Sequence, residues 1–207
     1  MNLEKYQAVV FDLETVVDQD TGILAALLPA FTTPADDLLG QFYAELKRLD
    51  GTFNSSSFVR LHALAYLNLA VARKVKVRTP DSLVFSRSAA HWPLFTSARP
   101  VFQALGKACA VVILTRQDSP PQHLLMEQIR LLSTQAIPTA GLGEWLNARS
   151  IRPAQALHVT LKSKATKPRL DKCLVRHEMN RRHWNGMVTI GCLSELVPDV
   201  ADAELRR

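Results

Sequence analysis

Residues 7–15 constrain the fold of this chain more than any other stretch, because they form an apolar run that ends on a carboxylate. The apolar residues 9–11 predict a buried strand, and Asp12 and Glu14 follow directly after it. In an open parallel sheet, ligands bind at the carboxyl ends of the strands. A carboxylate at that edge can act as a nucleophile, as an acid or base, or as a metal ligand. An aspartate that only caps the turn after a strand gives the same pattern, so both interpretations stay open at this point.

Further apolar runs alternate with helical patterns along the rest of the chain. Apolar runs that predict strands lie at 108–114, 156–160 and 187–190. Helical patterns lie at 98–105, 122–133 and 144–150. Strands that alternate with helices indicate βαβ units and a parallel sheet. We therefore predict an α/β protein with a Rossmann-like parallel sheet and helices on both of its faces.

Two predicted helices separate the first strand from the second. After a polar turn at 18–22, Thr33 and Pro34 start a helix as N-cap and first helical residue, and its apolar residues recur every three or four positions. Three consecutive serines then open a second helix, which continues to about residue 74. We expect an inserted helical cap at residues 19–85, and an α/β core formed by residues 1–18 and 86–207.

The second of these helices, at residues 58–72, is apolar on most of its sides. A helix that is apolar all round must be covered all round. Other parts of the same chain could cover it, and so could a second copy of the chain. A homodimer through the cap helices is therefore an open alternative.

The formal net charge of +6 is spread unevenly along the chain. Ten Lys and Arg residues lie between Arg149 and Arg182, and only Asp171 and Glu178 oppose them. Such a segment could attract an anionic substrate or a nucleic-acid backbone. Because no nucleic-acid-binding motif or interleaved aromatic residue accompanies the charges, we favour a solvated basic surface over a nucleic-acid-binding one, which stays the weaker alternative.

The sequence also indicates the cellular compartment in which we expect the protein. No apolar segment reaches the roughly 18–20 residues of a membrane span, and the N-terminal residues do not have the pattern of a signal peptide. Cys109, Cys173 and Cys192 lie far apart and match no metal-ligand spacing. We expect reduced thiols in a cytoplasmic protein that does not contact a membrane.

Several short segments, taken in order, carry a resemblance to a known family. They are the strand and carboxylate at 9–15, the helices at 33–74, the Trp-Pro segment at 91–95, the strand that ends on Thr115 and Arg116, and the segments at 156–159 and 179–181. Their order and spacing resemble the haloacid dehalogenase-like (HAD-like) hydrolase superfamily. Within it, the pattern is most similar to the type II haloacid dehalogenase group, which has a helical cap.

The resemblance implies roles for four residues. Asp12 would be a nucleophile that attacks a carbon or phosphorus atom and forms an aspartyl ester, which water then hydrolyses. Glu14 stands where phosphatases of the family have an Asp that acts as acid or base, and where dehalogenases have an aromatic residue. Thr115 would donate a hydrogen bond to the phosphate or carboxylate of the substrate, and Arg116 beside it would also bind the substrate.

Two family motifs are degenerate in this chain. The stretch 137–143 contains no lysine where the family has one, and the stretch 160–168 has three lysines where the family has acidic residues. Magnesium takes oxygen ligands, and a lysine-rich loop repels it. We therefore expect no cofactor. Lys162 or Lys164 could instead pair with Asp12 and bind an anionic substrate.

Two classes of function remain open from the sequence. The first is a hydrolase with Asp12 as nucleophile, acting without magnesium on a small anionic substrate such as a haloacid, an ester or a phosphate. A variant of it uses Asp12 and Glu14 as general acid and base in a non-hydrolytic reaction. The second is a catalytically degenerate HAD-like protein that serves as a binding or assembly module.

Overall fold

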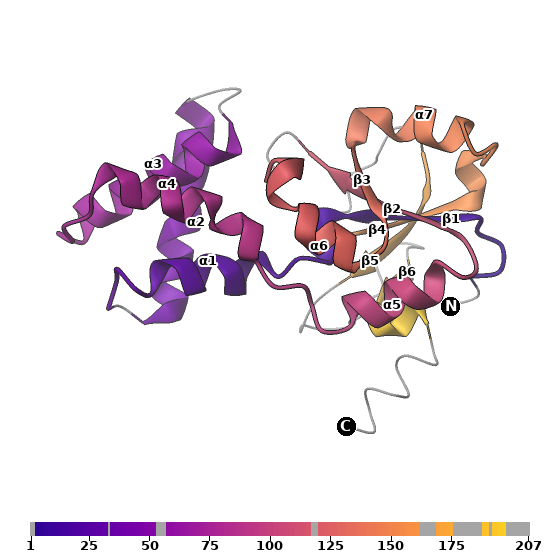
Figure 1. Cartoon of the computed structure of the whole chain (residues 1–207), viewed down its shortest axis with the longest axis horizontal. Coiled ribbons are helices and arrows are strands. Elements are labelled where there is room, and N and C mark those ends of the chain that lie inside the picture. The colour runs from indigo at the N-terminus through magenta and orange to yellow at the C-terminus, as the bar shows by residue number, and fades with distance from the viewer. Residues whose placement is uncertain are drawn as a thin grey trace, which may run out of the picture. The chain divides into compact units, whose positions relative to one another are not determined.

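A computed structural model describes residues 3–32, 34–52, 57–116, 120–161, 169–175, 188–190 and 192–197. The chain divides into two compact units, which are described separately below (Figure 1). The first consists of Met1–Val17, Leu94–Arg116 and Gln128–Arg207, and the second of Asp18–Pro93 and Gln117–Glu127. The expected boundary between residues 85 and 86 falls inside helix α4 (Thr79–Arg87). This helix packs against α3 (Phe58–Ala72), so all of it belongs to the second unit.

The first unit is built on a six-stranded sheet in the order β3-β2-β1-β4-β5-β6, with every neighbouring pair parallel. Its strands are β1 (Ala8–Asp12), β2 (Ala110–Thr115), β3 (Gln135–Pro138), β4 (Ala156–Thr160), β5 (Asp171–Val175) and β6 (Val188–Ile190). The predicted α/β class is confirmed. The sequence predicted only four strands, because β3 is a short edge strand and β5 begins with two charged residues.

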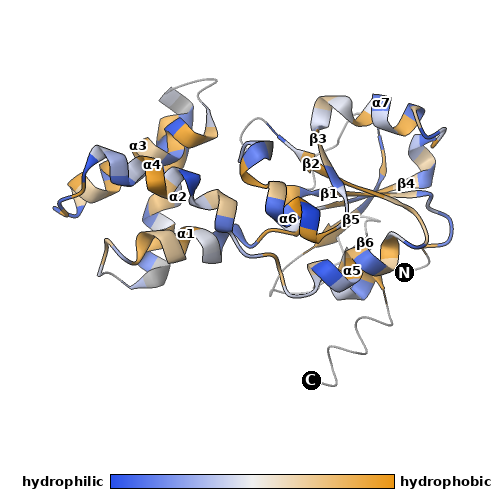
Figure 2. Ribbon diagram, viewed as in Figure 1, coloured by the Kyte–Doolittle hydropathy of each residue, from blue (hydrophilic) through white to orange (hydrophobic). Residues whose placement is uncertain are grey.

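Helices cover both faces of this sheet. On one face, Val10 and Val112 belong to a buried cluster with Trp145 of α7 (Leu142–Asn147). On the other face, the rings of Phe11 and Phe102 lie 4.5 Å apart, and Phe102 belongs to α5 (Ala98–Leu105). The central strands of the sheet accordingly consist mainly of hydrophobic residues (Figure 2). The remaining helix, α6 (Met126–Leu131), is shorter than the one predicted at 122–133, because a separate 3₁₀ turn forms Gln122–Leu124.

The second unit begins with α1 (Gln19–Leu27), where the sequence predicted a polar turn. That prediction was wrong, because the Asp18 carboxylate accepts a hydrogen bond from the backbone N–H of Thr21 at 3.1 Å and so caps a helix. Gly22 on α1 is buried, and a Cβ at this position would overlap the Cβ, Cγ and Cδ1 atoms of Trp92. A glycine is therefore needed for the close approach of α1 to the indole ring.

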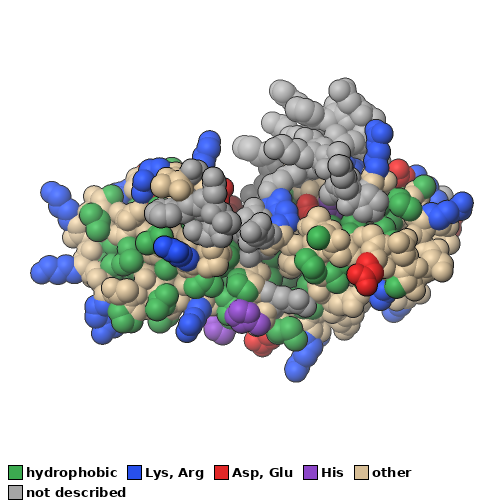
Figure 3. Space-filling model, turned by 90° about the horizontal axis from the view of Figure 1, so that it is seen from above, with side chains coloured by type: hydrophobic (Ala, Val, Ile, Leu, Met, Phe, Trp, Pro, Cys, Tyr) green, Lys and Arg blue, Asp and Glu red, His purple; other side chains and the backbone are tan. Residues whose placement is uncertain are grey.

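Aromatic side chains form the core of the second unit, between α2 (Ala35–Thr52), α3 and α4. Phe42 is fully buried, and its ring lies 5.2 Å from that of Phe85. Most apolar residues of α3 are buried within this unit, although Val71 at its end is 78% exposed. Figure 3 shows further hydrophobic side chains on the surface. Burial of α3 does not require a second copy, so the homodimer stays a prediction.

Two further predictions concerned membrane contact and the basic segment. No helix in the described part of the chain has the length and apolar character needed to cross a bilayer. Residues 162–168 and 176–182 of the basic segment lie outside the described residues.

His62 makes the stability of the second unit depend on pH. It is 8% exposed, its ring stacks on Phe58, and its Nδ1–H donates to the Phe58 carbonyl oxygen at 3.0 Å. Burial lowers the pKa of His62 from 6.5 to about 4, so folding favours the neutral ring. The stability that the unit gains from its preference for the neutral ring is complete above pH 6.5 and is lost as the pH falls toward 4. When the pH is lowered from 7 to 5, the free energy of unfolding measured with urea should fall by about 2 kcal/mol more for the wild type than for His62→Phe.

Candidate active site

Asp12 ends β1 at the carboxyl edge of the sheet, and β4 supplies its two side-chain partners. The β1–β4 register pairs Val10 with His158, so Asp12, His158 and Thr160 lie on the same face. The Asp12 carboxylate accepts hydrogen bonds from His158 Nε2 at 2.9 Å and from Thr160 Oγ1 at 2.5 Å, one on each oxygen. Asp12 is 6% exposed, and both of its partners are buried. Two donors from one strand therefore fix the orientation of the carboxylate.

The surroundings of Asp12 favour its ionised form. Burial alone would raise the pKa of this carboxyl group. The hydrogen bond and charge of His158, the hydrogen bond from Thr160 and the charge of Arg116 outweigh burial, so the pKa is lower than usual. Since an ionised carboxylate only accepts hydrogen bonds, His158 Nε2 carries the proton that it donates.

A further cation acts on Asp12 from β5. Lys172 on β5 is paired in register with His158 on β4, and β4 lies between β5 and the strand that carries Asp12. Burial lowers the pKa of the Lys172 ammonium, and the negative charge of Asp12 partly offsets this effect. Asp12 is thus an anion among cationic side chains, which favours an anionic ligand at this edge.

Glu14 and Arg116 are paired with each other. Glu14 lies in the 3₁₀ turn Leu13–Thr15 after β1, and Arg116 directly follows β2. Arg116 Nη2 lies 2.8 Å from Glu14 Oε1, and the side chains are 31% and 12% exposed, respectively. Glu14, the predicted acid or base, therefore neutralises the charge of Arg116, which was predicted to bind the substrate. An anion that contacts Arg116 has to compete with Glu14.

The Thr115 hydroxyl has a structural partner. Its Oγ1 donates a hydrogen bond to the carbonyl oxygen of Ile137 on the neighbouring strand β3, at 3.2 Å. This contact links the carboxyl ends of the two strands. While it persists, the hydroxyl proton is not available to a substrate.

The structure brings part of the predicted site together and adds residues that the sequence analysis missed. Asp12 lies near Arg116, which in turn pairs with Glu14. Lys162 and Lys164 lie outside the described residues. The missed residues are His158, Thr160 and Lys172. The signal for the first two was the strand predicted at 156–160, because its polar residues are two positions apart and so share a face.

The described residues at this edge do not fit a magnesium ion. Magnesium needs oxygen ligands in octahedral geometry. Of the two carboxylates that follow β1, Glu14 already pairs with the Arg116 guanidinium, so Asp12 alone would supply side-chain oxygens to the ion. In the part of the chain that the structure describes, no group of three or more Asp, Glu, His or Cys side chains could hold a metal ion.

No protein-family model and no curated protein matches the sequence, but solved structures resemble the fold. The L-2-haloacid dehalogenase PA0810 superimposes with a TM-score of 0.73 at 12% identity, over 95% of this chain and 99% of that chain. The L-2-haloacid dehalogenase from Xanthobacter autotrophicus gives 0.70 at 12% identity, over 95% and 98%. YfnB from Bacillus subtilis, described as a HAD hydrolase and bound to magnesium, gives 0.69 at 15% identity, over 94% and 98%.

These likenesses extend over nearly the whole of each chain, and at such low identity they concern the fold. They agree with the order of motifs in the sequence, from the carboxylate at the end of the first strand to the last strands of the sheet. The chain has the haloacid dehalogenase-like fold that these L-2-haloacid dehalogenases share.

Proposed function

We propose that this protein is a HAD-like hydrolase in which Asp12 is the nucleophile and magnesium takes no part. The observation that carries the proposal is the Asp12 carboxylate itself, which is ionised, oriented by two donors and located at the carboxyl edge of the sheet. A carboxylate has about four acceptor positions, so two hydrogen bonds leave lone pairs for attack on a substrate.

The reaction proceeds in two steps. A carboxylate oxygen of Asp12 forms a bond to the carbon or phosphorus atom of the substrate, and the leaving group departs with the electron pair of its bond. Water then hydrolyses the aspartyl ester, or the aspartyl phosphate where phosphorus was attacked, and restores the carboxylate. The structure of the Xanthobacter autotrophicus dehalogenase with chloropropionic acid covalently bound is a precedent for a covalent adduct on this fold.

The charges near Asp12 indicate the class of substrate. Arg116 and Lys172 both interact electrostatically with Asp12, so a small anion such as a haloacid, a phosphate or an ester with an acidic group suits this edge. Arg116 would exchange Glu14 for the anionic group of the substrate. Glu14, once released, could donate a proton to the leaving group or accept one from water.

Asp12→Asn tests this proposal directly. With 2-chloropropionate, p-nitrophenyl acetate and p-nitrophenyl phosphate as substrates, we expect the variant to lose hydrolysis by about a thousandfold or more, because an amide is a poor nucleophile. Asp50→Asn, an exposed change of the same chemistry, should keep the wild-type rate. With 2-chloropropionate, one turnover in ¹⁸O-water should place the heavy isotope in the Asp12 carboxylate, because water attacks the carbonyl carbon of the aspartyl ester. Equal rates for Asp12→Asn and the wild type would contradict the proposal.

A chelator tests the role of magnesium separately. Because the described residues do not fit the ion, hydrolysis should be unchanged after dialysis against EDTA, as followed by product release. A loss of activity that added magnesium restores would show that the reaction needs the metal.

The second candidate function is a catalytically degenerate binding or assembly module. It is favoured by the partners of the predicted site residues, since Glu14 and Arg116 pair with each other and Thr115 bonds to the main chain. For such a protein, the wild type and Asp12→Asn would give the same background rate with every substrate.

A further inference from the structure

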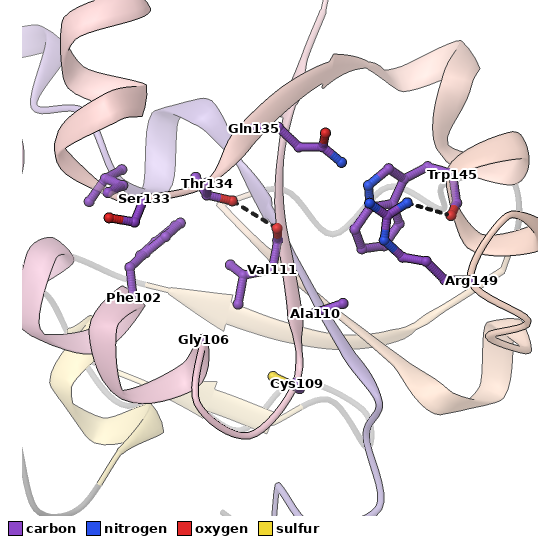
Figure 4. Close-up of a pocket in the computed structure, with 11 residues that line it drawn as sticks. Phe102, Gly106, Cys109, Ala110, Val111, Ser133, Thr134, Gln135, Trp145 and Arg149 are labelled. Atoms are coloured by element: carbon purple, nitrogen blue, oxygen red, sulfur yellow. Dashed lines mark hydrogen bonds between the residues drawn. The ribbon is translucent and has the colours of Figure 1, made fainter.

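A second candidate site lies at the opposite edge of the sheet from Asp12. A pocket of about 350 Å³ opens around the first residues of β2 and β3, at Ala110 and Gln135 (Figure 4). The β1–β2 register pairs Ala110 with Ala8 and Leu114 with Asp12, so the pocket and Asp12 lie at opposite ends of these strands. Its volume is within the usual range of small-molecule sites, about 300–1,000 Å³.

Arg149 supplies the only charge among the described residues that line the pocket. Its guanidinium lies 4.4 Å from the centre of the Trp145 ring, and its Nη1 donates to the Trp145 carbonyl oxygen at 3.3 Å. With the Gln135 amide oxygen turned toward the donors, this oxygen accepts from Arg149 Nη2 at 3.3 Å and from Trp145 Nε1. These partners are uncharged. They hold the guanidinium in place without neutralising it, which prepares it for an anion.

Apart from Arg149, the pocket is lined by apolar side chains, which include Phe102, Val111 and Leu132, and by the polar side chains of Ser133, Thr134 and Gln135. Figure 4 shows Phe102 on one side and Trp145 with Arg149 on the other, with Val111 between them. Aromatic rings pack favourably on aromatic side chains and on the planar guanidinium of arginine. A single arginine matches the single charge of a carboxylate and can bind it through two parallel hydrogen bonds.

We propose that this pocket binds a small aromatic carboxylate. The carboxylate pairs with Arg149, and the ring packs against the apolar part of the lining, at Phe102 and Val111. The site shares no described residue with the Asp12 edge, so it is independent of the proposed hydrolase activity.

The test uses the full-length ¹⁵N-labelled protein and benzoate as the probe. Benzoate should shift the indole N–H signal of Trp145, identified by its loss in Trp145→Phe, and the shift should saturate. Acetate has the charge without the ring, and benzyl alcohol has the ring without the charge, so each should bind about tenfold more weakly or worse.

Substitution of Arg149 is the second part of the binding test. Arg149→Gln should weaken benzoate binding at least about tenfold, while Arg99→Gln, an exposed change on α5 outside the pocket, should leave it unchanged. The spectrum and the urea midpoint of each variant verify that it is folded. The proposal is wrong if the Trp145 signal does not respond, if acetate or benzyl alcohol binds as well as benzoate, or if Arg149→Gln binds like the wild type.

Discussion

Replacing His158 with alanine should lower the free energy of unfolding by about 3 kcal/mol, because it removes a hydrogen-bond donor from a buried carboxylate. His158 is 1% exposed, and its Nε2 donates to Asp12. Without this donor, the carboxylate stays in a place where burial opposes its charge, and the lost ring leaves a cavity beside it. Urea denaturation at pH 7 measures the loss, which would be a large part of the 5–15 kcal/mol typical of a native protein.

A double-mutant cycle separates the pair from the cavity. Asp12→Ala, His158→Ala and the double variant should show a coupling of at least about 1 kcal/mol, so that the double change costs less than the sum of the single changes. His91→Ala removes an exposed histidine and should stay within about 0.5 kcal/mol of the wild type. Additive costs would mean that the two side chains do not stabilise each other.

The second large effect concerns Gly22, whose replacement by alanine should cost about 3 kcal/mol. The new methyl group would overlap the Cβ, Cγ and Cδ1 atoms of Trp92. The Cβ atom of Trp92 does not move in a rotamer change, so rotation of the side chain alone cannot remove the overlap. Trp92 is 3% exposed and its ring packs edge-on against Phe58, which leaves little room for retreat. Far-UV circular dichroism during urea denaturation gives the midpoint.

Gly40 provides the matched control in the same unit. It lies within α2, and a Cβ at this position would meet nothing within 4 Å. Gly40→Ala should therefore stabilise the protein by up to about 1 kcal/mol, as alanine does in an exposed helix. If Gly22→Ala and Gly40→Ala had the same effect, α1 would not pack against Trp92 as described.

The sequence predicted the central strands because burial on both faces leaves a continuous apolar run. β1, β2 and β4 all have this character, and their positions were predicted to within about two residues, the usual uncertainty of strand ends. β3 and β5 were missed because their residues are only partly apolar: β3 includes the exposed Gln135, and β5 begins with Asp171 and Lys172. In such strands the pairing partners, rather than the local pattern, determine the structure.

The sequence could predict the position of a single site residue, but not the contacts between residues on different strands. Asp12 could be placed at the carboxyl edge from its own strand. The contact with His158 depends on which strands are neighbours and in what register, and neither follows from local sequence. The same holds for Glu14 and Arg116, which come together because β1 pairs with β2 although Asp18–Pro93 lies between these strands in the sequence.

That long connection also affects the order in which the protein can fold during synthesis. β1 leaves the ribosome before the other strands of its sheet, and both of its neighbours, β2 and β4, are made only after Asp18–Pro93. An apolar strand with two unpaired edges is prone to associate with other chains until its partners arrive. A bridge between Val17 and Leu94 closes the connection once the chain returns. β1 is therefore paired on both edges only after the much longer segment between it and β2 has been made.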